Sequence, residues 1–309
     1  MRVVFLGTPT FAIPSLRLLA RSFDVVGVVT QPDRPAGRGR HRRPSAVRHA
    51  AAGLGLPVCL PEKVRTPDTF ATIHAWCPDV IVVVAYGQIL PPALLELAPL
   101  GCLNLHASLL PRWRGAAPVQ AALLHGDAET GVTVMRMDAG LDTGPILAQQ
   151  AIPIREEHTG GTLAAELSQV GAELLVQVLP RYAAGELTPR AQDDSLATFA
   201  PRLQRRDGDL DPAHAAADLA RRIRAFDPWP GARLQWGAEV IRVLAARALD
   251  APPARPGTIV QADGYPAMAT GNGLLVLLRL QRPGGRPLDG QAFLAGHPRF
   301  VGSVLRRPD

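Results

Sequence analysis

Short apolar runs without polar interruptions alternate with helix-like stretches in the first half of the chain. The apolar runs are residues 3–6, 25–29 and 80–84. A strand that is apolar on both faces is typical of a parallel sheet covered on both sides. Helices are predicted between these runs, over residues 10–21, 45–54 and 67–76. The alternation predicts a doubly wound α/β domain, whose ligands bind beyond the carboxyl ends of the strands.

The second half of the chain has a different pattern. Helical spacing of apolar residues returns at residues 159–184, and a polar stretch with four prolines between residues 180 and 212 then predicts a linker. Beyond it we expect a helix at 213–226 and short strands at 232–236, 240–246, 257–261 and 274–280. Such strands, separated by Gly and Pro, are typical of a small antiparallel barrel. The predicted boundaries are residues 1–187 for the α/β domain, 188–206 for the linker and 207–309 for the barrel.

The composition excludes several classes of protein. The longest apolar run, residues 80–86, is far shorter than the roughly 20 residues of a membrane helix. The apolar run near the N-terminus is too short for a secretion signal, so we expect a cytoplasmic protein. The three cysteines are widely spaced and form no CxxC pair, which argues against a disulfide framework and against a zinc site.

The net charge of +6 is concentrated in two places. Residues 1–200 carry 17 basic and 17 acidic side chains, whereas residues 201–309 carry 16 basic and 10 acidic ones. Within the neutral part, residues 34–48 hold six arginines and no acid. This distribution suggests a polyanionic partner, although a solvated surface explains the charge equally well.

The turn after the first predicted strand does not have the pattern of a nucleotide site. Gly7-Thr8-Pro9 lacks the later glycines of a dinucleotide fingerprint, and no P-loop motif occurs in the chain. A dehydrogenase and a P-loop NTPase are therefore not indicated.

The polar residues that could carry chemistry lie farther along the chain. Asn104 and His106 are two positions apart in a predicted strand, which places both on one face, and a later glycine-containing loop carries Asp138 and Asp142. A carboxamide can donate to an oxyanion, an imidazole can move a proton, and a carboxylate can orient the imidazole. Together they suggest an acyl-transfer site. Each residue also has a structural alternative: a satisfied core histidine, an asparagine bonded to local backbone, or a plain aspartate turn.

Long motifs in the chain closely resemble the folate-dependent formyltransferases, in particular those that act on initiator methionyl-tRNA. The matching segments are residues 104–118 and 127–144, together with 5–9, 31–40, 83–87 and 222–230. The resemblance implies a Rossmann-like domain with a mostly parallel sheet, followed by a small OB-like β-barrel that binds tRNA. It also implies a formyl donor, 10-formyltetrahydrofolate, and an acceptor, the α-amine of methionine on the initiator tRNA. The product would be N-formylmethionyl-tRNA for translation initiation, made by a monomeric enzyme that needs no metal.

The resemblance also assigns roles to individual residues. The catalytic residues it implies are Asn104, His106 and Asp142, with Asn104 and protonated His106 holding the oxyanion and Asp142 keeping His106 charged. The implied folate-binding residues are Tyr86, Gly87, Gln88, Ile89, Leu90, Ser108, Leu109, Leu110, Pro111 and Asp138. The implied tRNA-binding residues are Arg38, Arg40, Arg42 and Arg43.

Two other functions fit parts of the sequence. A formyltransferase that acts on a small amine would use the same three catalytic residues, but it would leave the arginine-rich loop and the basic barrel unexplained. A non-catalytic RNA-binding protein would have no reason to keep all three. The chain also departs from the family pattern in places. Ala107 stands where glycine is common, and no tryptophan follows Asp211.

Overall fold

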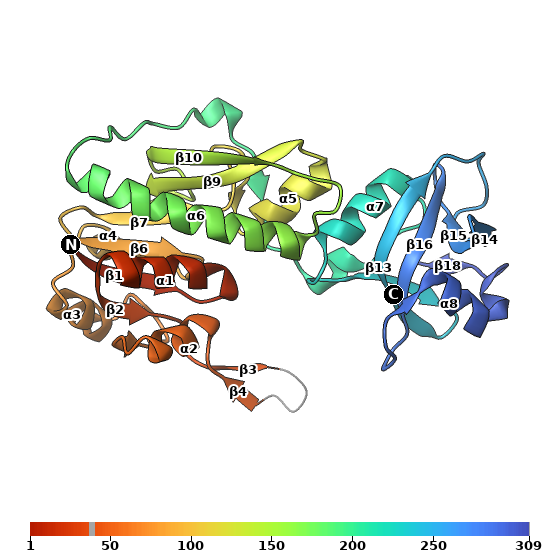
Figure 1. Ribbon diagram of the computed structural model, residues 1–309, viewed down its shortest axis with the longest axis horizontal. Coiled ribbons are helices and arrows are strands. Elements are labelled where there is room, and N and C mark those ends of the chain that lie inside the picture. The colour runs from red at the N-terminus through yellow and green to blue at the C-terminus, as the bar shows by residue number, and fades with distance from the viewer. Residues whose placement is uncertain (37–40, 309) are drawn as a thin grey trace. The chain divides into compact units, whose positions relative to one another are not determined.

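The computed structural model describes residues 1–36 and 41–308, which form two compact units (Figure 1). The first unit consists of Met1–Pro118, Glu129–Pro153 and Ala164–Ala200. The second consists of Val119–Ala128, Ile154–Leu163 and the chain from Pro201 onward. The segment between residues 188 and 200 therefore belongs to the first unit. The domain boundaries at residues 187 and 207 stay predictions.

A seven-stranded mixed sheet forms the centre of the first unit (Figure 1). Its strands, in spatial order, are β10 (Ile146–Pro153), β9 (Glu129–Arg136), β7 (Cys102–His106), β6 (Val80–Val84), β1 (Arg2–Gly7), β2 (Asp24–Val29) and β5 (Val58–Cys59). The last five are parallel to one another, whereas β9 is antiparallel to β7 and β10 is antiparallel to β9. The predicted mostly parallel sheet is confirmed.

Helices cover both faces of this sheet. They are η1 (Thr10–Ala12), α1 (Ile13–Ser22), α2 (Ala46–Gly53), α3 (Pro67–Ala75), α4 (Pro92–Leu95) and α6 (Gly160–Ala183). Ile81 and Cys102 point to the face where they pack with Ile73 of α3 and Leu94 of α4. Side chains alternate along a strand, so Leu105 points to the other face, where it meets Gly171 of α6. A methyl group at Gly171 would lie 2.6 Å from Leu105 Cδ2, so the glycine permits this close packing.

Antiparallel strands make up the sheet of the second unit. In spatial order they are β14 (Ile259–Ala262), β15 (Tyr265–Ala269), β16 (Leu274–Gln281), β13 (Glu239–Leu249), β12 (Ala232–Trp236) and β18 (Leu305–Arg306), with β17 (Leu288–Asp289) beside β16. The two outer strands also meet: Ile259 N donates to Ser303 O at 2.9 Å, and Leu305 N donates to Gly257 O at 2.8 Å. These bonds close the sheet, which confirms the predicted small barrel.

The remaining elements are short. They are α5 (Pro118–His125), α7 (Ala216–Ala225), α8 (Gly290–Gly296), η2 (Asp194–Leu196), η3 (Arg205–Gly208), η4 (Pro298–Phe300), β3 (Arg34–Ala36), β4 (His41–Arg43), β8 (Arg114–Gly115) and β11 (Phe199–Ala200). Leu219 and Ile223 of α7 pack with Phe293 of α8 in the core of the barrel. Among the described residues, no helix is both long enough and apolar enough to cross a bilayer.

Two glycines in the first unit differ in the space around them, and this difference predicts opposite effects of adding a methyl group. In Gly27→Ala the new Cβ would lie 2.3 Å from the Trp76 ring, so the ring must move, at a cost of about 1–3 kcal/mol. In Gly53→Ala the Cβ meets nothing within 4 Å at the end of α2, and we expect a gain of about 0.5–1 kcal/mol. Urea unfolding of the two variants checks this, and equal effects would contradict it.

Candidate active site

The predicted catalytic residues come from the end of one strand and from one loop. Asn104 and His106 lie on β7, on the same face as Cys102. The loop after β7 runs through Trp113 to Gly115, and the loop between β9 and β10 carries Asp142. Both Gly115 and His106 lie close to the Asp142 carboxylate. The structure therefore places His106 and Asp142 together at the carboxyl end of β7.

The imidazole of His106 has a hydrogen-bond partner at one ring nitrogen and none within hydrogen-bond distance, among the described residues, at the other. His106 Nε2 lies 2.9 Å from the carbonyl oxygen of Trp113, and His106 Nδ1 lies 3.7 Å from Asp142 Oδ2. A carbonyl oxygen only accepts, so Nε2 carries a proton. Nδ1 is consequently the nitrogen that remains for chemistry. Its distance to the carboxylate exceeds that of a hydrogen bond, and such catalytic contacts often tighten only when substrate is bound.

Asp142 has a fixed orientation. Its Oδ2 accepts a hydrogen bond of 2.8 Å from the backbone N–H of Gly115, and its side chain is only 16% exposed. The residue itself has a φ of +54°, a left-handed conformation that is uncommon for any residue except glycine. The loop thus holds an unfavourable backbone conformation in order to present this carboxylate to His106.

Asn104 is a buried polar group whose amide is still available. The residue is 9% exposed, and its side chain makes no hydrogen bond to any residue in the described part of the chain. A fully buried amide without a partner would cost about 1–3 kcal/mol. The amide of Asn104 is not among the fully buried unpartnered groups, so it keeps contact with solvent. It can therefore donate to a bound ligand.

Several of the predicted folate-binding residues build the loops themselves. Ser108 is buried, and its hydroxyl donates to Arg112 O. Asp138 Oδ1 accepts from Gly140 N at 3.0 Å and from Thr143 Oγ1 at 2.7 Å, which closes the turn that contains Asp142. These polar groups are used internally and shape the site.

The predicted folate-binding residues after β6, residues 86–90, also include side chains that are used within the protein. Gln88 Oε1 accepts from Val64 N at 2.8 Å, and the side chains of Tyr86 and Leu90 belong to the hydrophobic core. Burial raises the pKa of the Tyr86 hydroxyl far above its usual range, with a further contribution from nearby Cys59. The ring of Tyr86 therefore faces the core, and its carbonyl oxygen already accepts from Thr8 Oγ1 at 2.8 Å and from Gln31 Nε2 at 2.9 Å.

The other predicted folate-binding residues differ in their exposure. Ile89 is 93% exposed and Gly87 is exposed, whereas Leu109 and Pro111 are half-buried and Leu110 is buried. Leu141, which directly precedes Asp142, is another large apolar side chain in contact with solvent.

The predicted tRNA-binding arginines are described only in part. Arg38 and Arg40 lie outside the described residues. The backbone of Arg42 belongs to β4, which pairs with β3, and Arg43 is exposed at the end of that strand.

Three groups of this site were missed by sequence reasoning. They are the carbonyl of Trp113, the N–H of Gly115 and the side chain of Gln192, which contacts the Asp142 loop. The first two lie in the motif that carries the resemblance, but they are backbone groups without a side-chain signature. Gln192 lies in the segment predicted as a linker.

The described residues contain no group of three or more His, Cys, Asp or Glu side chains that could hold a metal ion.

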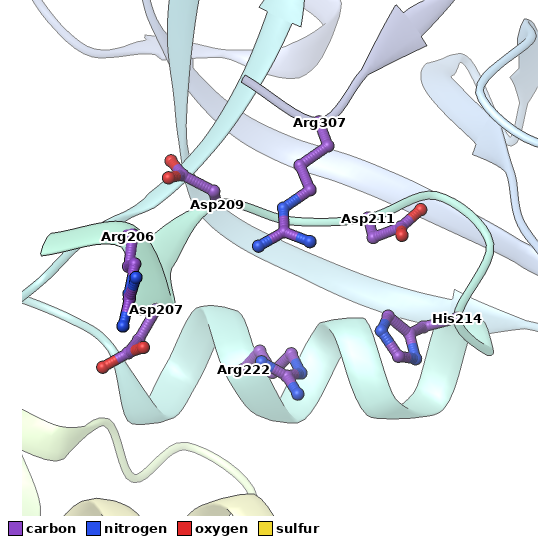
Figure 2. A pocket seen from close by; sticks show the side chains of 7 residues that line it. All are labelled: Arg206, Asp207, Asp209, Asp211, His214, Arg222 and Arg307. Carbon is purple, nitrogen blue, oxygen red and sulfur yellow. The ribbon is translucent and has the colours of Figure 1, made fainter. Parts of the chain in front are cut away.

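A cavity of about 200 Å³ lies wholly within the second unit (Figure 2). Its lining is almost entirely charged and consists of Arg206, Asp207, Asp209, Asp211, His214, Arg222 and Arg307. The aspartates bond to neighbouring groups: Asp207 accepts from Gln204 N, Asp209 pairs with Arg233, and Asp211 accepts from Ala213 N. The side chains of the three lining arginines have no ion-pair or hydrogen-bond partner within the described chain.

Comparison with known proteins identifies the family. The formyl transferase family model matches residues 1–179, and the model of the formyl transferase C-terminal domain matches residues 202–298. The chain therefore belongs to the formyl transferase family, and the resemblance found in the sequence is confirmed.

Close relatives carry a more specific name. A methionyl-tRNA formyltransferase of Pseudomonas putida is 50% identical over 310 residues, which cover 99% of this chain and 99% of the relative. A methionyl-tRNA formyltransferase of Roseiflexus is 49% identical over 303 residues, which cover 96% of this chain and 92% of the relative.

Solved structures share the fold at low sequence identity. An N-formyltransferase from Helicobacter canadensis, in complex with folinic acid and dTDP-3-aminofucose, has a TM-score of 0.65 at 16% identity and covers 91% of this chain and 99% of its own. HypX from Aquifex aeolicus, in complex with tetrahydrofolic acid, has a TM-score of 0.63 at 17% identity and covers 97% of this chain and 48% of its own.

The hydrogen bond from Gly115 to Asp142 yields a prediction about turnover. Gly115 has a φ of +116°, and a Cβ there would lie 2.7 Å from Ala200 O, so Gly115→Ala must move the backbone N–H. We expect the kcat of formyl transfer to fall about 10–100-fold, because small displacements of catalytic groups are costly.

Gly185→Ala is the matched control. Gly185 also has a positive φ, of +73°, but a Cβ there meets nothing within 4 Å. We expect this variant to lose stability and to keep its kcat. Steady-state kinetics of both variants, with thermal denaturation alongside, test the prediction; a Gly115→Ala enzyme with normal kcat would refute it.

Proposed function

We propose that this chain transfers the formyl group of 10-formyltetrahydrofolate to the α-amine of initiator methionyl-tRNA. The product, N-formylmethionyl-tRNA, starts translation. The single observation that carries the proposal is the site around His106: its open Nδ1 faces Asp142, and the available amide of Asn104 lies on the same strand. This site occurs in a chain that is about half identical, over nearly its whole length, to relatives named methionyl-tRNA formyltransferase.

The reaction begins with attack of the amine on the formyl carbon. The nitrogen lone pair forms the new C–N bond, and the π electrons of the carbonyl move onto its oxygen. The Asn104 amide and the Nδ1–H of protonated His106 donate to this oxyanion. Two such donors, fixed before the reaction, stabilise charge that develops only in the transition state.

Collapse of the tetrahedral intermediate completes the transfer. The carbonyl re-forms, the bond from the formyl carbon to the folate nitrogen breaks, and that nitrogen takes up the proton lost by the amine. Asp142 orients the imidazole of His106 and assists this proton movement, because its Oδ2 lies 3.7 Å from Nδ1. The bond that forms and the bond that breaks at the formyl carbon both join substrate atoms, so no covalent enzyme intermediate is needed.

We assign the folate to the loops that surround Asp142. The exposed side chains of Ile89 and Leu141 supply apolar surface, and a pterin ring is a planar group that such side chains can cover. The turn closed by Asp138 fixes the loop that carries Leu141. The remaining predicted folate residues then act by holding the loops in shape.

We assign the tRNA to the arginine-rich segment and to the second unit. Residues 34–48 carry six arginines without an acid, and residues 201–309 carry an excess of six positive charges. The unpaired side chains of Arg206, Arg222 and Arg307 gather around one cavity, where backbone phosphates could pair with them (Figure 2). Since the three catalytic side chains come from one chain, we further propose a monomer that works in the cytoplasm, where initiator tRNA and folate meet.

Removing the oxyanion donors tests the enzymatic proposal. We expect Asn104→Ala and His106→Ala each to lower kcat by about 10²–10³-fold, the usual loss for one oxyanion-hole donor. The assay follows formyl transfer from 10-formyltetrahydrofolate to initiator methionyl-tRNA and, in parallel, to small amines such as amino sugars. Unchanged turnover in both variants would show that the chemistry lies elsewhere. If the enzyme formylates a small amine faster than initiator methionyl-tRNA, the proposed acceptor is wrong and the acceptor is a small amine.

Arg38→Ala tests the tRNA assignment. Each lost phosphate contact lowers the slope of log affinity against log salt by about one unit, so we expect weaker binding of initiator tRNA and a flatter salt dependence. Arg65→Ala is the control, since Arg65 is exposed and lies outside the arginine-rich segment. If both variants bind tRNA like the parent enzyme at every salt concentration, the segment does not contact the tRNA.

A further inference from the structure

The side chain of Gln192 holds the backbone of the catalytic loop. Gln192 Nε2 donates to Asp142 O at 2.8 Å and to Gly144 O at 2.7 Å. A side-chain amide has two N–H groups, so these two carbonyls use its full donor capacity. They lie on either side of Thr143 and therefore fix the turn immediately behind the Asp142 carboxylate.

The other end of the same amide is held as well. Gln192 Oε1 accepts from Arg114 Nε at 3.1 Å and from Arg114 Nη2 at 2.8 Å. Arg114 is only 4% exposed, and its Nη2 also pairs with Asp194 at 2.7 Å. A charged donor makes a stronger hydrogen bond than a neutral one, so Arg114 fixes which way the amide points.

These contacts form a closed ring through the active site. Arg114 is followed in the chain by Gly115, whose N–H donates to the Asp142 carboxylate at 2.8 Å. The ring therefore runs from the Asp142 carboxylate through Gly115, Arg114 and Gln192 back to the carbonyl of Asp142. Both ends of the aspartate, the side chain and the backbone, are held by the same structure.

The ring accounts for the conformation of Asp142. A non-glycine residue with a φ of +54° costs free energy and persists only where its surroundings determine it. We propose that Gln192 is a positioning residue for catalysis: it maintains the left-handed turn at Asp142 and thereby keeps the carboxylate directed at His106. This inference rests on the proposed role of Asp142 in formyl transfer.

The variant Gln192→Glu removes the hydrogen-bond donors of the amide and keeps its acceptor. A carboxylate has nearly the shape of the amide and still accepts from Arg114, but it cannot donate to the two carbonyls. We expect kcat to fall about 10–100-fold, as for other small displacements of a catalytic group, while the KM values for the folate and the tRNA change less than about threefold. Gln192→Met removes both donors without adding charge, and we expect the same loss of kcat.

Gln150→Glu is the matched control. Gln150 is exposed on β10 of the same unit and bonds only to the neighbouring Ala151 O, so the variant carries the same chemical change away from the loop. Its kcat should equal that of the parent enzyme. Thermal denaturation of all variants shows whether they are folded at the assay temperature.

A double-mutant cycle shows whether Gln192 acts through Asp142. If it does, Gln192→Glu and Gln192→Met will slow the parent enzyme but add little to the loss caused by Asp142→Asn, because the two residues then contribute to one step. If either Gln192 variant lowers kcat by the same factor in the Asp142→Asn enzyme as in the parent, Gln192 does not act through Asp142. That result, or an unchanged kcat in the parent background, overturns the inference and leaves the proposed function standing. If Asp142→Asn alone retains full kcat, the proposed role of Asp142 fails and the inference fails with it.

Discussion

The hydrogen bond from Gly115 N to Asp142 Oδ2 is the contact on which the site depends. It joins the loop after β7 to the loop between β9 and β10, and it fixes the carboxylate 3.7 Å from His106 Nδ1. The same loop after β7 also supplies the Trp113 carbonyl that anchors His106 Nε2. The imidazole and the carboxylate are therefore oriented by neighbouring backbone groups of a single segment, which couples their positions without a direct hydrogen bond between them.

Asn104 and His106 are both buried polar residues that keep one group available for a ligand. Asn104 and His106 lie at the inner part of a sheet, where an unpaired polar group is costly, and each meets that cost differently. His106 uses one ring nitrogen for a structural bond and leaves the other open. Asn104 keeps its amide at the edge of solvent, unpaired within the described chain. A ligand oxygen that binds there would gain both donors without displacing a hydrogen bond between protein groups.

The layout of the fold could be predicted from the sequence because its signals are local. Apolar runs without alternation mark β1, β2 and β6, and glycines and prolines mark the barrel strands. The helix expected at residues 213–226 begins only at Ala216, since Ala215 and Ala216 pair with Asn272 on the barrel. The strands β9 and β10 were not predicted: β9 joins the sheet by pairing with β7 and β10, and pairing between separate segments is not a local pattern. Pairing between distant segments thus marks the limit of prediction from the pattern.

The same limit applies to the site. Asn104, His106 and Asp142 are side chains in long motifs, so a resemblance can identify them. Gly115 acts through its N–H and Trp113 through its carbonyl, and any residue could supply those groups. What selects them is conformation: Trp113 and Asp142 have φ values of +61° and +54°, and Ala85, directly after β6, has +48°. Trp113 and Asp142 are non-glycine residues that contact His106, and their left-handed conformations cost stability that the surrounding contacts offset. Sequence identifies the groups that react, and only the folded backbone shows how they are held.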